Sequence, residues 1–206
     1  MYPFVETIRI EKGEICNIFY HQQRLARTMR HFYPQATVPL LSEALSRRKW
    51  PDDKIWKVHI EYDASGILLV KTEEYHIRQI RSLRLIDDDE ISYAYKSADR
   101  RCLSDLSALK GDADEIVIVR NGLLTDTSYS NIALFDGCQW ITPLHPLLEG
   151  TMRQSLLDQG VVTARDIRAE EWTDFRKVSL INAMMPLGRC VCSSICCFFW
   201  CWGFPY

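Results

Sequence analysis

Four turn sequences divide most of this chain into short apolar segments, and they constrain the fold more than any other feature. Asn121-Gly122 and Asp136-Gly137 are typical of two-residue β-hairpin turns, because Asn, Asp and Gly tolerate positive φ angles. Lys12-Gly13 and Ser65-Gly66 interrupt apolar runs in the same way. The sequence therefore predicts a chain built largely from short antiparallel strands.

Residues 1–90 are predicted to form an α+β unit. Leu25, Met29 and Phe32 recur at helical spacing before Pro34, which predicts a helix over residues 21–32. An acidic segment, residues 87–90, marks the expected end of the unit. The other predicted elements are a helix over 42–49 and strands over 5–10, 14–19, 55–62, 66–73 and 83–86.

Residues 91–189 are predicted to form a second α/β unit that is richer in strands. A helix with Leu103, Leu106 and Leu109 on one side is expected to end at Gly111, and a second helix covers residues 150–159. A chain of 206 residues can form one fairly large domain or two small ones that share a core. The predicted strands cover 115–119, 123–127, 130–135, 139–141, 161–167 and 178–181.

The composition excludes several classes of partner. A net charge of −2 gives no electrostatic reason to expect nucleic acid or an acidic membrane surface as a partner. The chain does not open with a basic stem, an apolar core and a small-residue cleavage site, so no export signal is expected. We therefore expect a cytoplasmic protein.

The eight cysteines do not indicate a disulfide framework or a metal centre. Three are scattered, and five crowd into residues 190–201 without the His or Cys partners of a zinc site. The segment 190–206 has no clear periodicity and is expected to be an atypical tail. A reading-frame change near Gly188 is one hypothesis for its origin; an independent genomic read with an unchanged frame would refute it.

Lys96 is the first candidate for chemistry. A lysine that forms a Schiff base must be neutral, so its pKa has to be lowered by burial or by a nearby cation. Tyr93 and Tyr95 could supply part of a dry wall around it. The alternative is a solvated surface lysine, which is the commoner situation for any single lysine.

Asp126 is the second candidate, because a carboxylate next to a pyridine nitrogen keeps that nitrogen protonated. The alternative is an Asp that caps a turn or a strand end. Asn131 lies five residues later and is expected to face the other side of the strand, where it would order the loop.

A phosphate site is the third candidate. Gly150-Thr151-Met152-Arg153 begins a predicted helix, whose unpaired amides favour an anion. Arg24 could reach the same anion from the first helix, or it could be a solvated charge. Met184 and Met185 are interpreted as core residues rather than pocket lining. An amine, a carboxylate and a phosphate site are the parts needed to hold pyridoxal phosphate.

Seven short motifs in this order resemble the class IV aminotransferases, which are the fold type IV proteins among pyridoxal phosphate enzymes. The resemblance covers roughly residues 4–187. The motifs are Glu6-Thr7-Ile8-Arg9, His21-x-x-Arg24-Leu25, Tyr95-Lys96-x-x-Asp99-Arg100, Leu124-Thr125-Asp126-x-x-x-x-Asn131, Thr142-Pro143, Leu148-Glu149-Gly150-x-x-Arg153 and Ile181-Asn182-Ala183-Met184.

The resemblance implies a role for each candidate residue. Lys96 would be the catalytic Schiff-base lysine, and Arg24 would grip the cofactor phosphate. Asp126 would take the place of the family's glutamate beside the ring nitrogen, with its carboxylate about 1.5 Å closer to the backbone. The remaining implied cofactor contacts are the backbone amides of Thr151 and Met152, with Asn182 beside the phosphate.

The resemblance also implies a fold and a function. The fold would be α+β, with two small α/β domains of the D-amino acid aminotransferase-like kind and the cofactor cleft between them, in a homodimer whose partner helps to close the pocket. The enzyme would act on a small-molecule amino substrate, either as a 4-amino-4-deoxychorismate lyase, which releases pyruvate and 4-aminobenzoate, or as an amino acid aminotransferase. The spacing and the Ile181–Pro186 ending are more similar to the lyase branch.

The alternative is a non-catalytic relative that keeps the fold as a binding or structural protein. Two departures from the family favour it: the chain begins almost at the Glu6 motif, and the segment after Leu187 is atypical. The joint presence of Lys96, Arg24 and Asp126 argues for an enzyme.

Overall fold

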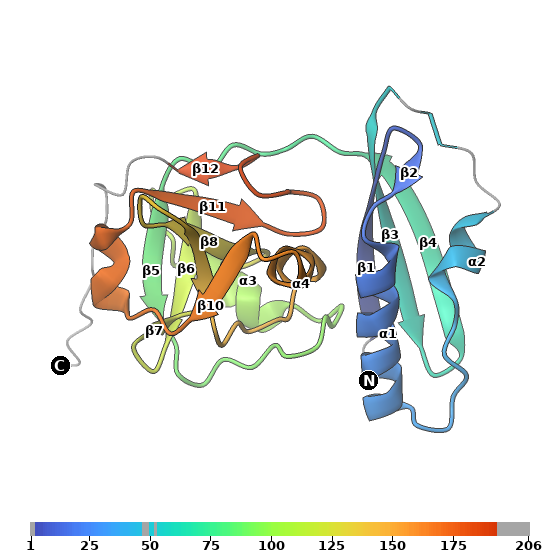
Figure 1. Ribbon diagram of the computed structural model, residues 1–206. Helices are drawn as coiled ribbons and strands as arrows, with labels where there is room; N and C mark the ends of the chain where they lie inside the picture. The colour runs from blue at the N-terminus through green and yellow to red at the C-terminus, as the bar shows by residue number, and fades with distance from the viewer. Residues whose placement is uncertain (1–2, 47–49, 52, 193–206) are drawn as a thin grey trace.

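The computed structural model describes residues 3–46, 50–51 and 53–192, and its strands form two groups that lie side by side (Figure 1). The first group is an antiparallel sheet in the order β2-β1-β3-β4. Helices α1 and α2 belong to the same group. Their bounds are Phe4–Glu11 (β1), Glu14–Ile15 (β2), Ile18–Phe32 (α1), Leu41–Ser46 (α2), Ile55–Asp63 (β3) and Gly66–Glu74 (β4).

The first hairpin forms at the predicted turn, but its second strand is shorter than expected. Lys12 and Gly13 have φ angles of 52° and 75°, which suit a tight hairpin turn. The expected strand over residues 14–19 is wrong beyond Ile15. Asn17 adopts a left-handed conformation with φ 55°, and this ends the extended backbone so that α1 begins at Ile18.

Helix α1 covers one face of the first sheet and forms its core. Ile8 and Ile10 of β1 pack against Leu25 and Met29 of α1, and all four are fully buried. Side chains two apart on a strand share a face, so Glu6 points from β1 toward the same helix. A carboxylate is therefore placed inside an otherwise apolar interface.

The second group contains two sheets, in the orders β5-β6-β7 and β10-β9-β8-β11-β12. Trp172 and neighbouring apolar side chains from both sheets form one buried cluster. The bounds are Leu83–Asp87 (β5), Arg101–Ala108 (α3), Glu115–Arg120 (β6), Leu123–Leu124 (β7), Asn131–Phe135 (β8), Trp140–Pro143 (β9), Thr151–Asp158 (α4), Val162–Arg165 (β10), Ala169–Asp174 (η1, a 3-10 helix), Lys177–Ile181 (β11) and Val191–Cys192 (β12).

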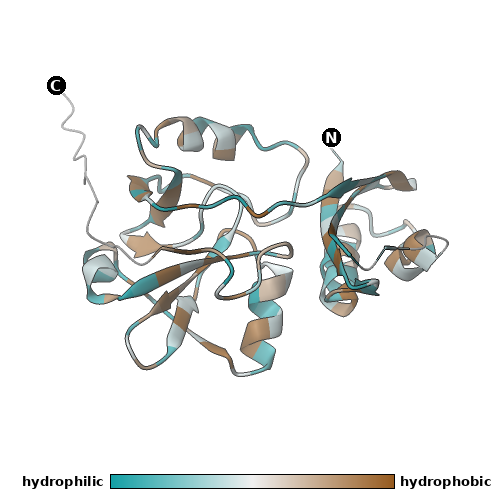
Figure 2. Ribbon diagram, turned by 90° about the horizontal axis from the view of Figure 1, so that it is seen from above, coloured by the Kyte–Doolittle hydropathy of each residue, from teal (hydrophilic) through white to brown (hydrophobic). Residues whose placement is uncertain are grey.

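Strand β5 pairs in parallel with β6 of the second group, whereas residues 83–86 are expected from the sequence to belong to the first unit. The chain therefore reaches the second group of strands before residue 83. The connection between the two groups is visible both in the first view and from above, where apolar residues mark many of the strands (Figure 2).

The fold continues further into the cysteine-rich segment than expected. Val191 and Cys192 pair with Ser179 and Val178 of β11, and the thiols of Cys190 and Cys192 donate to backbone carbonyls of Arg78 and Ile80. The expectation of an atypical tail from residue 190 is therefore wrong for 190–192. The rest of that segment, residues 193–206, lies outside the described residues.

None of the helices formed by the described residues has the length and apolar character that a membrane crossing requires.

Candidate active site

The segment that carries Lys96 returns from the second group of strands to the edge of β1. The amide of Val5 donates to the Lys96 carbonyl at 2.9 Å, and the amide of Ala98 donates to the Pro3 carbonyl at 2.8 Å. Tyr95 stacks on His31 of α1 with ring centroids 4.8 Å apart. Lys96 is thereby fixed where the two groups of strands meet.

A cavity of about 300 Å³ opens at this junction and is lined by both groups. Five of the six predicted site residues line it: Arg24, Lys96, Asp126, Thr151 and Asn182. Cavities of this size hold small organic ligands. Tertiary folding therefore gathers residues that are spread over more than 150 positions of the chain.

The environment of Lys96 favours a neutral amine. Burial and the neighbouring Arg24 together lower the pKa of Lys96 from 10.5 to about 7, although Glu6 opposes the change. The side chain keeps some exposure because it lines the open cavity. Near neutral pH a substantial fraction of this lysine is an unprotonated nucleophile.

Asp126 is held rigidly by two hydrogen bonds. Its Oδ1 accepts from Asn131 Nδ2 at 2.8 Å, and its Oδ2 accepts from the Leu148 amide at 2.9 Å. The expectation that Asn131 faces away from Asp126 is wrong. The two residues form an antiparallel bridge across a tight loop, which places their side chains next to each other.

Asp126 is buried and lies where a cationic ligand group would stabilise its charge. Burial raises the pKa of Asp126 to about 6, although the hydrogen bonds from Leu148 and Asn131 oppose this. A cation next to the carboxylate would favour its ionised form.

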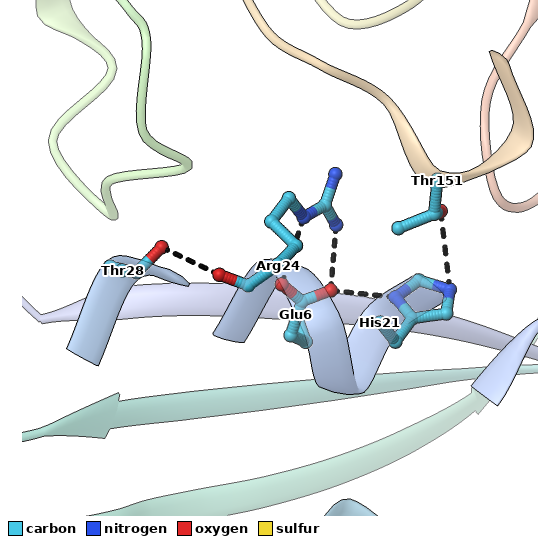
Figure 3. Close-up of polar contacts among 5 residues, drawn as sticks. All are labelled: Glu6, His21, Arg24, Thr28 and Thr151. Atoms are coloured by element: carbon cyan, nitrogen blue, oxygen red, sulfur yellow. Dashed lines mark hydrogen bonds and ion pairs between the residues drawn. The ribbon is translucent and has the colours of Figure 1, made fainter. Parts of the chain in front are cut away.

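Arg24 is one member of a buried polar network that joins β1, α1 and α4 (Figure 3). Its Nε and Nη2 donate to the two oxygens of Glu6 at 2.9 and 2.6 Å, in the bidentate geometry typical of strong arginine–carboxylate pairs. Burial raises the pKa of Glu6, but Arg24 and His21 outweigh it and hold that pKa at about 2. The third guanidinium nitrogen of Arg24 points away from Glu6 (Figure 3).

Helix α4 begins beside Arg24. Thr151 lines the same cavity, and its hydroxyl lies 3.4 Å from His21 Nε2. The Met152 side chain packs into the core with Leu156 and Val162, so only its backbone belongs to the first turn of α4. A Cβ at Gly150 would overlap the Asn131 side chain. Glycine at this position therefore lets the start of α4 lie close to Asn131, which is the hydrogen-bond partner of Asp126.

Asn182 orders a turn in the cavity wall. Its Oδ1 accepts from the amides of Met184 and Met185 at 2.8 and 3.0 Å. The buried Arg9 of β1 donates to the Met184 carbonyl at 2.7 Å and ties this turn to the first sheet. Met184 and Met185 are both buried, as expected of core residues, and Met184 also lines the cavity.

Several residues of the site have no role that is predicted from the sequence. Glu6 could have been found as the charged residue among inward-facing positions of an apolar strand. His21 lies three residues before Arg24 and so shares its helix face. Lys57 and Arg100 also line the cavity and add positive charge, but no local pattern points to Lys57.

Comparison with known proteins identifies the family. Residues 4–191 match the family described as amino-transferase class IV. The chain belongs to the class IV aminotransferase family. An uncharacterized protein from Haemophilus influenzae is 36% identical over 189 residues, which is 91% of this chain and all of that protein.

Solved structures confirm the class IV aminotransferase fold. A candidate 4-amino-4-deoxychorismate lyase from Haemophilus somnus superposes with a TM-score of 0.87 at 34% identity, over 91% of this chain and 98% of that one. A hypothetical aminotransferase from Mycobacterium tuberculosis, in a pyridoxal phosphate-bound form, superposes with a TM-score of 0.70 at 15% identity, over 92% of this chain and 80% of that one. The second likeness concerns the fold alone.

Proposed function

We propose that this class IV aminotransferase family member is a pyridoxal phosphate-dependent enzyme with Lys96 as its catalytic lysine. The observation that carries the proposal is a cavity that contains an amine of lowered pKa and a firmly held carboxylate. The same cavity includes Arg24 and the first residue of α4, which fit a phosphate. The amine, the carboxylate and the phosphate-binding residues correspond to the aldehyde, the ring nitrogen and the phosphate of the cofactor.

When bound, pyridoxal phosphate supplies an electron sink for a carbanion of the amino substrate. Lys96 would bind the cofactor aldehyde and, when released, would move a proton at the substrate carbon. Asp126 would hold the ring nitrogen protonated, and Asn131 and the Leu148 amide would keep that carboxylate in place. Arg24 and the Thr151 end of α4 would anchor the phosphate, and Met152 would contribute only its backbone amide.

The proposed reaction is 4-amino-4-deoxychorismate cleavage to pyruvate and 4-aminobenzoate, with amino acid transamination as the second candidate. The Haemophilus somnus structure favours the lyase, as does the resemblance of the Ile181–Pro186 sequence to the lyase branch. The structural relatives that are named as aminotransferases keep transamination open, since the two reactions share their first steps. We also infer a homodimer, which light scattering of the purified chain would test.

Two assays on the pyridoxal phosphate-loaded protein separate the candidates. Mixing with 4-amino-4-deoxychorismate should release pyruvate at a rate that the K96A variant does not reach. Mixing with an amino acid and a keto acid should exchange the amino group only if transamination is the function. A loaded protein that is silent in both assays would support the non-catalytic alternative.

A further inference from the structure

Arg24 and Thr151 together form the candidate phosphate site, called here the Arg24–Thr151 anion site. His21 connects its two sides. Its Nδ1 lies 2.6 Å from Glu6 Oε2, and its Nε2 lies 3.4 Å from Thr151 Oγ1 (Figure 3). The imidazole is completely buried. It is also the only link in Figure 3 between the Glu6–Arg24 pair of the first group and the start of α4.

The proton positions in this network follow from its chemistry. Glu6 is ionised at neutral pH because its pKa is about 2, so His21 Nδ1 must carry a proton and donate to it. Burial lowers the pKa of His21, and the charges of Arg24 and Lys96 lower it further while Glu6 opposes them. Nε2 is then unprotonated and accepts from the Thr151 hydroxyl.

A phosphate monoester in the anion site changes this arrangement. A dianion offers only acceptors, so the Thr151 hydroxyl is drawn to donate to a phosphate oxygen. Its donation to Nε2 is then lost, and a buried Nε2 without a donor is costly. The added negative charge also offsets Arg24 and Lys96, which disfavour a charged imidazole.

We propose that His21 is a positioning residue that couples occupation of the Arg24–Thr151 anion site by a phosphate group to uptake of one proton at its Nε2. The proton comes from solvent. The Thr151 O–H bond stays intact and turns from Nε2 to the phosphate, and the new Nε2–H donates to Thr151 Oγ1. The imidazolium then forms a continuous line of hydrogen bonds from Glu6 to the bound anion. This inference rests on the phosphate site of the proposed function.

Nuclear magnetic resonance of the imidazole nitrogens tests the proposal directly. Histidine labelled with ¹⁵N would be followed while the whole chain is titrated with methyl phosphate, a simple phosphate monoester, at several pH values. The H21Q variant identifies the His21 signals among the five histidines. We expect the His21 pKa to rise by about one unit or more on saturation, because a nearby anion favours the charged imidazole.

Variants of Thr151 provide the matched controls. T151V removes the hydroxyl and should abolish most of the rise, whereas T151S keeps the hydroxyl and should preserve it. If H21Q does not fold, the loss of the phosphate-dependent signal in T151V identifies His21 instead. A His21 that stays neutral with phosphate bound, or a chain that does not bind phosphate at all, would overturn the proposal.

The probe keeps this test separate from the proposed function. Methyl phosphate has no aldehyde, so its effect on His21 does not require a covalent bond to Lys96 and should persist in K96A. Failure of pyridoxal phosphate to react at Lys96 would contradict the proposed enzyme but leave the proton coupling intact. Binding of phosphate without protonation would contradict the coupling alone.

Discussion

Asn131 Nδ2 donates one hydrogen bond to Asp126 Oδ1 and another to the Leu148 carbonyl, both at 2.8 Å. The same side chain occupies the space that a Cβ at Gly150 would take. Asn131 therefore fixes the carboxylate in the cavity and requires a glycine at the start of α4.

The contact between Asn131 and Gly150 predicts that substitutions at the two positions have strongly non-additive effects on the free energy of unfolding. G150A should destabilise the protein by about 1–3 kcal/mol, because the new methyl group overpacks the site. N131A should cost about 1–3 kcal/mol by leaving buried polar groups without partners. The double variant should be markedly less destabilised than the sum, since N131A creates the space that G150A needs.

Urea unfolding of the wild type, both single variants and the double variant measures this coupling. G160A is the matched control for a glycine-to-alanine change, since nothing lies within 4 Å of a Cβ at Gly160, although its φ of 66° strains any side chain. Its effect should be independent of N131A. Strict additivity for G150A and N131A would show that the contact has no energetic role.

The low pKa of Glu6 predicts that the protein loses a specific part of its stability in acid. Its pKa falls from 4.5 to about 2 on folding, so its contribution is complete above pH 4.5 and disappears as the pH falls through 2. Linkage gives about 3 kcal/mol for this contribution at neutral pH. E6Q should therefore be less stable than wild type by about that amount at pH 7, and the difference should vanish near pH 2.

Denaturant unfolding of wild type and E6Q between pH 2 and pH 7 measures this difference. E74Q is the control, because Glu74 pairs with Lys54 at the surface and should contribute much less. A difference between E6Q and wild type that does not change with pH would contradict the assigned ionisation.

The proposed role of Asp126 predicts that its variants lose turnover but still bind the cofactor. In D126N the amide cannot stabilise a positive charge on the ring nitrogen, so we expect turnover to fall by about 10²-fold or more. The visible absorbance of the bound cofactor should persist, because it depends on Lys96. D126E restores the charge but displaces the carboxylate by one methylene and breaks its contacts with Leu148 and Asn131, so it should recover only part of the rate.

Steady-state turnover and absorbance of D126N and D126E, each loaded with pyridoxal phosphate, test this separation. N131D adds a second carboxylate and is expected to raise the pKa of Asp126 further. Full activity of D126N would exclude Asp126 as the partner of the ring nitrogen.

Local sequence patterns predicted the parts of the fold that depend on neighbouring residues. The Asn121-Gly122 turn has φ angles of 52° and 73°, and it connects β6 to β7 as expected. The parallel pairing of β5 with β6 was not predictable, because its partners are separated by an entire helix. Asn131 was misplaced for a related reason: the loop after Asp126 reverses the chain, and period-two reasoning assumes one continuous strand.

Prediction of the site from local sequence patterns has the same limit. Lys96, Asp126 and Arg24 are predictable from their chemistry and from the family resemblance, and the cavity brings them together. Lys57 was missed because a lysine on an alternating strand gives no sign of the cavity that it borders. The unpredicted helix η1, with its buried Trp172, similarly depends on packing between two sheets.

The most direct test of the account is the position at which pyridoxal phosphate attaches to the chain. Borohydride reduction of the soaked protein, followed by peptide mass mapping, should place the added mass on Lys96 and remove the visible absorbance. K96A should carry no such mass, whereas K57A should label normally even though Lys57 lines the same cavity. Attachment at Lys57, or a folded protein that acquires no label, would contradict the central claim.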